Sequence, residues 1–220
     1  MWQALYEDVN DSNFEIICVA EDTMGEEAAG QWFDAANASY VCIVDPTHMI
    51  STLFGFINVP AAAWIDEEGR IVRINEGTYP SRHTIENELA GTIKFGNDVY
   101  NPAVRDWIAK GNESEHVWSP EEVRGHLKPA TDDTAIADPT FKLGVFFKLQ
   151  GDDAKAKRYF EEAQRLSPSN WNYHRQDWTY EGERTAGKNW YKKSQALGDA
   201  PYYDALELPG EVPPPPGEVL

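Results

Sequence analysis

The feature that most restricts how this chain folds is an alternation of short apolar runs with helix-patterned segments in its first 95 residues. Apolar residues recur at helical spacing over 2–9. Residues 14–20 and 40–44 are nearly continuous apolar runs with many β-branched side chains, and they predict strands that are buried on both faces. A helical apolar face lies between them at 28–36. This order predicts parallel strands joined through a helix.

The rest of this region predicts a hairpin and two more helices. Residues 49–54 form a short helical pattern that ends at Gly55, the residue type favoured in a left-handed end position. Residues 61–65 and 70–74 predict two strands joined by the Gly-containing turn 66–69. A helix capped by Ser81 is expected next, with its apolar positions at Ile85, Leu89 and Ile93.

Charge divides the chain into two parts. The sequence has 19 basic and 37 acidic residues, a net charge of −18, which argues against nucleic acid or an anionic membrane as a partner. Residues 1–100 hold 4 basic and 17 acidic side chains, so two domains are expected. No apolar run is long enough to span a membrane, and the first residues do not resemble a secretory signal, so a cytoplasmic location is expected.

The second half predicts helices and then a tail. Residues 96–133 are expected to be a connector, with a short helix from Pro120 after a Ser119 cap. Asp138 is expected to cap the next helix, with Pro139 as its first residue, and Gly151 to end it before Asp152 caps another. The resulting boundaries are 1–95, 96–133, 134–203 for a helical domain, and 204–220 for a Pro-rich tail.

The helical domain resembles a single tetratricopeptide repeat. Eight residues stand at that repeat's offsets: Leu143, Gly144, Phe147, Gly151, Ala156, Phe160, Ala163 and Pro168. The position that is tryptophan in the repeat is Thr140 in this sequence. Of these residues, Leu143, Gly144, Phe147, Ala156, Phe160 and Ala163 are expected to pack two helices together. One repeat cannot bury its own outer face, so it must pack against another part of the chain or a partner.

An aromatic segment follows this repeat and offers packing partners. It contains Trp171, Tyr173, Trp178, Tyr180, Trp190, Tyr191, Tyr202 and Tyr203. We interpret these residues as core and inter-domain packing, with nearby basic residues meeting the acidic first domain. A peptide-binding groove is the alternative, in which the same basic residues attract acidic ligands: Arg175, Arg184, Lys188, Lys192 and Lys193.

The first hundred residues resemble the thioredoxin-like fold of the TlpA/ResA (redoxin) type, entered part-way through. Four segments carry the resemblance: 14–20, Val44-Asp45-Pro46, 53–60 (Leu-Phe-Gly-Phe-Ile-Asn-Val-Pro) and 64–72 (Trp-Ile-Asp-Glu-Glu-Gly-Arg-Ile-Val). The resemblance implies a cis peptide bond at Val59-Pro60 and a substrate-binding role for both residues. It also places a central strand, absent from this chain, between strands 14–20 and 61–65. The expected fold is thus an incomplete α/β thioredoxin-like domain followed by an all-α tetratricopeptide-like domain.

The redox motif of that fold is absent. Thiol exchange needs a cysteine whose pKa is lowered at a helix N-terminus, usually in Cys-x-x-Cys. The only two cysteines, Cys18 and Cys42, lie in expected buried strands, so we predict that they are buried, unreactive and not disulfide-bonded. The five histidines show no metal-ligand spacing. No catalytic residue, metal or cofactor is therefore assigned.

Three explanations account for the missing strand: a partner supplies it, the two flanking edges close on each other, or the sequence starts downstream of the true start. Some TlpA/ResA-like proteins with a helical-repeat extension carry Trp-Ala-x-x-selenocysteine-Gly-x-x-Cys. A selenocysteine codon read as a stop would leave a chain starting near Met1, so we favour the third explanation.

The expected function is thiol-disulfide or thiol-peroxide exchange in a longer form, with this chain inactive as written. Its substrate would be a thiol, a disulfide or a peroxide. The alternative is a non-enzymatic module that binds a partner protein through its tetratricopeptide-like domain.

Overall fold

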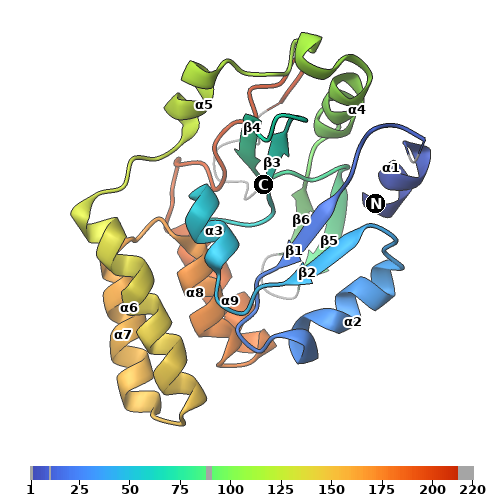
Figure 1. Ribbon diagram of the computed structural model, residues 1–220. Helices are drawn as coiled ribbons and strands as arrows, with labels where there is room; N and C mark the ends of the chain where they lie inside the picture. Colours follow the sequence, from blue (N-terminus) through green and yellow to red (C-terminus); the bar gives the residue numbers. More distant parts are fainter. Residues whose placement is uncertain (1, 10, 88–90, 213–220) are drawn as a thin grey trace.

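The computed structural model describes residues 2–9, 11–87 and 91–212 (Figure 1). It is a mixed α/β fold. Up to residue 95 the elements are α1 (Trp2–Asp8), β1 (Ile17–Ala20), α2 (Glu26–Ala36), β2 (Val41–Val44), α3 (Met49–Phe54), β3 (Ala61–Ile65), β4 (Ile71–Glu76), β5 (His83–Asn87) and β6 (Gly91–Phe95). They are followed by α4 (Tyr100–Lys110), the 3-10 turn η1 (Gly111–Glu113), α5 (Pro120–His126), α6 (Asp132–Leu149), α7 (Asp153–Leu166), α8 (Trp171–Thr179) and α9 (Glu183–Gln195).

The first two strands form the expected parallel pair, with the helix α2 between them in sequence. Their predicted burial on both faces is wrong. Ile17 pairs with Val41 and Val19 with Ile43, so these four residues share one face, and Ile17 is 62% exposed. The apolar run therefore reflects a sheet face that the described helices leave open to solvent.

Strands β3 and β4 form the predicted antiparallel hairpin. Among the described residues, β1 pairs only with β2 and β3 only with β4. Each of these strands consequently has one edge with no strand partner in the described part of the chain. The two edges do not close on each other, so this explanation of the missing strand is wrong. Open edges of this kind are sites for strand addition.

The helix expected after Ser81 is instead the hairpin β5–β6, in which Ile85 pairs with Ile93. β-branched residues are dense in both strands, and they favour extended backbone over helix. Gly91, with a φ of 70°, begins the second strand in a conformation that suits glycine. Leu89, the third residue of the expected helical face, lies outside the described residues.

The helix α6 starts seven residues earlier than predicted, at Asp132 and not at Pro139. Thr131 caps it, because its hydroxyl accepts from the Thr134 amide while the Thr134 hydroxyl accepts from the Thr131 amide. Pro139 consequently lies inside the helix, and Asp138 pairs with Lys142 instead of capping. The break at Gly151 and the Asp152 cap of α7 are as predicted.

The residues that the structure describes form two apolar cores. The first joins Leu5 of α1, Trp64 of β3, and Tyr100 and Val104 of α4. The expected connector 96–133 thus contains a helix that belongs to the first core. The short helix after Ser119 is confirmed, with a capping box to Glu122.

The second core lies between α6, α7 and α8. Gly144, Ala156, Phe160 and Ala163 meet there, since a methyl group on Gly144 would lie 2.6 Å from the Phe160 ring. Phe147 packs at the border of this core, whereas Leu143 is exposed.

The segment after α9 returns to the first core and is not an exposed tail over its whole length. Leu206 and Leu208 are buried with the residues of α4. Arg73 of β4 donates to the carbonyls of Leu206 and Glu207. Leu206 and Leu208 are therefore part of the folded core, which shortens the expected tail.

Candidate functional site

The Val59-Pro60 bond is cis, as predicted. The loop around it is closely held. The Glu76 carboxylate accepts from the amides of Ile57 at 2.7 Å and Asn58 at 3.0 Å. Burial raises the pKa of Glu76, while these two hydrogen bonds act in the opposite direction.

Both polar backbone groups of Val59 already have partners. Its amide donates to the Asn58 side-chain oxygen at 3.0 Å, and its carbonyl accepts from the Tyr203 hydroxyl at 2.6 Å. A substrate backbone that paired with Val59 would first have to displace Tyr203. The side chain of Val59 is therefore more available for contact with a ligand than its backbone is.

A shallow cleft of about 330 Å³ lies beside the Val59 side chain. Three parts of the chain form its walls: the end of β1, the start of α3 and one face of α8. The lining residues are Glu21, Asp22, His48, Val59, Asn172, Arg175, Gln176 and Thr179. The cleft thus forms where the first half of the chain meets the C-terminal helices.

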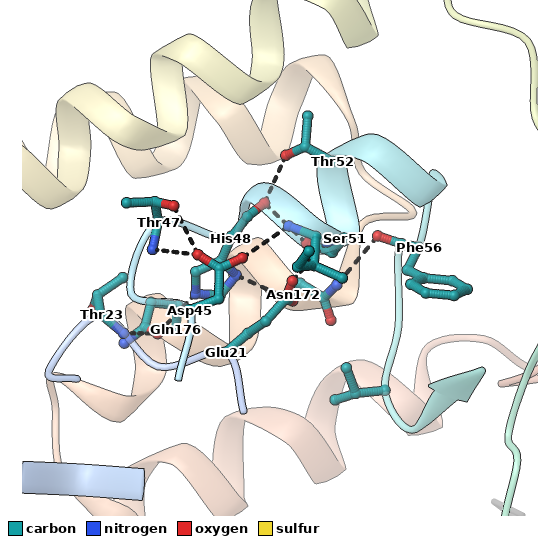
Figure 2. Close-up of polar contacts among 12 residues, drawn as sticks. Glu21, Thr23, Asp45, Thr47, His48, Ser51, Thr52, Phe56, Asn172 and Gln176 are labelled. Atoms are coloured by element: carbon teal, nitrogen blue, oxygen red, sulfur yellow. Dashed lines mark hydrogen bonds and ion pairs between the residues drawn. The ribbon is translucent and has the colours of Figure 1, made fainter. Parts of the chain in front are cut away.

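Within this cleft, Glu21, His48 and Gln176 form a buried row (Figure 2). The Gln176 side-chain oxygen accepts from the Thr23 amide at 3.1 Å, which fixes the orientation of the side-chain amide. The same oxygen lies 3.2 Å from His48 Nε2, so Nε2 must carry a hydrogen. The other ring nitrogen, Nδ1, faces the Glu21 carboxylate at 3.6 Å.

The turn after β2 positions His48. Asp45 accepts from the Thr47 amide at 3.0 Å and from the Ile50 amide at 2.8 Å. Burial acts to raise the pKa of Asp45, but these hydrogen bonds leave it below its usual range. They hold His48 at a φ of 52°, a left-handed conformation that is uncommon for residues other than glycine. Strained backbone of this kind is found at functional sites more often than elsewhere.

Several buried polar atoms at the cleft have no hydrogen-bond partner. They are His48 Nδ1, Asn172 Oδ1, Arg175 Nε and Gln176 Nε2. His48, Asn172 and Gln176 are each 4% exposed. Leaving such groups unpaired costs about 1–3 kcal/mol each, so this wall is chemically suited to a polar ligand that offers both donors and acceptors.

A second cleft, of about 490 Å³, lies between the α3 end, β4 and α5, and includes Glu76 and Lys128. None of the described residues that line it has an unpaired buried side-chain atom. We therefore take the cleft at Val59 as the candidate site.

The two cysteines line neither cleft. Both are free, as predicted, but both are partly exposed, so their predicted full burial is wrong. The described residues contain no cluster of metal-ligating side chains. Nucleophilic thiol or metal chemistry is not among the functions that the cleft residues provide.

The aromatic segment packs between the two halves, as interpreted from the sequence. Tyr180 hydrogen-bonds with Thr23, and Trp171 donates its amide to the Ile57 carbonyl at 2.7 Å. Arg175 donates to the Tyr202 hydroxyl, and Lys193 donates to the Pro168 carbonyl at 3.1 Å. Neither of these contacts joins the basic side chain to an acidic residue of the first domain.

The polar row was not predicted from the sequence. His48 and Gln176 are separated by 128 positions, and no spacing rule connects a histidine after an Asp-Pro pair with a glutamine on a distant helix. Only the turn itself, Asp45-Pro46, had a local signal.

No protein-family model matches the chain, and neither a curated protein nor a solved structure matches it. Among the described residues, no helix combines the length and apolar character needed to cross a membrane.

Proposed function

We propose that this chain is the scaffold and substrate-facing part of a thioredoxin-like oxidoreductase. Its redox thiols would be carried on a strand-helix unit that pairs between β1 and β3. The unit belongs either to the same polypeptide or to a partner. The observation that carries the proposal is the pair of open edges, one on β1 and one on β3. One inserted strand would satisfy both edges and convert two small sheets into one.

The two thiols of the chain support the proposal that the redox thiols lie on a separate unit. Burial raises the pKa of both Cys18 and Cys42, so little of either is ionised at neutral pH. Both lie within strands and not at a helix N-terminus, where a thiolate is stabilised. A catalytic nucleophile that is ionised at neutral pH must then come from outside these residues.

The cleft at Val59 would face the substrate on which the thiols of the inserted unit act. Its polar wall, built from His48, Asn172 and Gln176, would bind the polar groups of a disulfide- or peroxide-containing substrate. Arg175 adds a positive charge to this wall. The substrate class is accordingly polar.

The experiment compares three proteins in disulfide and hydroperoxide reduction assays. The first is the 220-residue chain. The second is the chain extended at its N-terminus by a strand-helix unit bearing Trp-Cys-x-x-Cys, and the third is the same extension with both motif cysteines changed to serine. We expect turnover only from the second protein. Turnover by the unextended chain, or none by an extended chain that folds, would refute the proposal.

A second candidate function, a protein-interaction module, is favoured by one further observation. The helix α6 carries exposed apolar residues on the side away from its core: Ile136, Leu143, Phe146 and Leu149. Apolar residues on all sides are typical of a helix that is covered all round, and the tetratricopeptide-like pair would use this side to bind a partner.

Photo-cross-linking tests this second function. A photoreactive residue is placed at Leu143, and a control at Lys157, an exposed residue of α7. A cross-link to another protein from position 143 and not from position 157 would support the module. Equal cross-linking from both positions, or none from position 143, would argue against it.

A further inference from the structure

The two cysteines lie directly opposite each other in the parallel pair β1–β2. Cys18 is the register partner of Cys42. Neighbouring strands are about 4.8 Å apart, so the two Cα atoms fall within the range of about 4.4–6.8 Å that disulfides span. Directly opposite residues also point to the same face of a sheet. The register thus brings two thiols together that are 24 positions apart in the sequence.

The electrostatic environment of one nearby side chain agrees with this register. Tyr40 lies two residues before Cys42, directly before β2. Burial raises the pKa of Tyr40, and negative charge on Cys18 and Cys42 adds to the increase. The pKa of Cys18 is raised by burial and, in addition, by Cys42. Such effects fall off with distance, so the three groups lie close together.

Both thiols are free and partly exposed, so small oxidants can reach them. This differs from the sequence-based expectation of isolated, buried thiols. A pair of adjacent, accessible thiols has a chemistry that neither has alone, since oxidation of one is followed by attack from the other.

We infer that Cys18 and Cys42 form a two-electron dithiol site that a hydroperoxide oxidises to a cross-strand disulfide. The Cys42 sulfur attacks the peroxide oxygen, and the O–O bond breaks. The departing oxygen takes a proton and leaves as an alcohol, or as water when the oxidant is hydrogen peroxide, while Cys42 becomes a sulfenic acid. The Cys18 sulfur then attacks the Cys42 sulfur, the S–O bond breaks, and the hydroxide leaves as water. Two thiols lose two electrons and two protons in total.

This modification goes beyond the proposed function and does not rest on it. Burial raises the pKa of both thiols, so few are ionised at neutral pH. The reaction is therefore slow and stoichiometric at neutral pH, and it accelerates as pH rises. The product joins the edge strand β2 covalently to β1. It changes the stability of this sheet without supplying a turnover cycle.

The test treats the reduced 220-residue chain with hydrogen peroxide at neutral pH and about two pH units higher. Free thiols are counted, and peptides are mapped by mass spectrometry without reduction. We expect both thiols to disappear together, a linked peptide pair containing Cys18 and Cys42 with two hydrogen atoms fewer, and a monomeric chain. The rate should be higher at the higher pH.

Two comparisons make the outcome decisive. In denaturant, where the strands no longer hold the thiols together, the share of oxidised chains that carry the intramolecular link should fall about tenfold. The Cys18→Ser and Cys42→Ser variants should each yield a sulfinic acid or a linked dimer. Separate oxidation of both cysteines in the native chain, or an equal share of linked chains in denaturant, would overturn the inference.

Discussion

Replacing Arg73 with methionine should remove a buried cation that connects three distant parts of the chain. Arg73 is 1% exposed. It donates to the Asn75 side chain at 2.8 Å, to the His116 carbonyl at 2.6 Å, and to the carbonyls of Leu206 and Glu207. Its guanidinium also lies 4.1 Å from the centre of the Trp118 ring. Burial lowers the pKa of Arg73 to about 10, so the group remains charged at neutral pH.

The expected loss follows from these contacts. Each buried carbonyl left without a donor costs about 1–3 kcal/mol. The carbonyls of His116 and Glu207 lose their Arg73 donor, while the Leu206 carbonyl keeps the Asn75 side-chain amide at 3.4 Å. Release of the buried charge offsets part of this cost, since a well-packed apolar side chain needs no desolvation. The net destabilisation of Arg73→Met should be about 3–4 kcal/mol. Arg73→Lys keeps the charge but not the planar fork, and should cost about 2–3 kcal/mol.

Urea unfolding followed by tryptophan fluorescence measures this loss. The matched control is Arg82→Met. Arg82 is exposed and pairs with the exposed Asp98 at 2.7 Å, so its loss should change the free energy of unfolding by about 0.5 kcal/mol or less. A change of less than about 1 kcal/mol for Arg73→Met, or equal effects at both positions, would refute the reasoning.

Three further predictions concern packing and pH. Gly144→Ala should destabilise the chain by about 1–3 kcal/mol because the new methyl meets the Phe160 ring, whereas Gly187→Ala, with open space around it in α9, should be neutral or stabilising in thermal unfolding. Burial, with a contribution from a nearby lysine, lowers the pKa of His174 to about 4. The unfolded chain alone then binds a proton between about pH 6.5 and 4, and stability should fall by about 2 kcal/mol as pH drops through this window; His174→Gln should remove that loss in denaturant titrations. Burial raises the pKa of Tyr100 above its usual value, so stability present below about pH 10 should be lost at higher pH by about 1.4 kcal/mol per pH unit, and Tyr100→Phe should reduce this slope.

The elements predicted correctly are those with a strong local signal. The turn around Gly69, the helix end at Gly55 and the Ser119 cap depend on neighbouring residues, and all three are present. The helix predicted after Ser81 is wrong. Ile85 and Ile93 fit a helical spacing, but the β-branched pairs Thr84-Ile85 and Thr92-Ile93 favour two strands. Asp138-Pro139 carried a cap signal that the earlier box at Thr131 overrode.

The candidate site was largely beyond sequence reasoning. Val59 and Pro60 were identified through a resemblance, and the cleft does lie beside Val59. His48, Asn172 and Gln176 came together only through tertiary packing of α8 on the first half of the chain. The position of Tyr203 over the Val59 carbonyl has the same origin.

The most direct test of the central claim, that a strand pairs between β1 and β3, is amide hydrogen exchange. In the 220-residue chain, the amides of Ile17–Ala20 and Ala61–Ile65 that point away from β2 and β4 should exchange rapidly, because they have no strand partner. In the chain extended by the strand-helix unit, the same amides should become protected, while those already bonded within β1–β2 and β3–β4 should change little. Protection of the open-edge amides in the unextended chain, or no gain of protection in the extended one, would contradict the account.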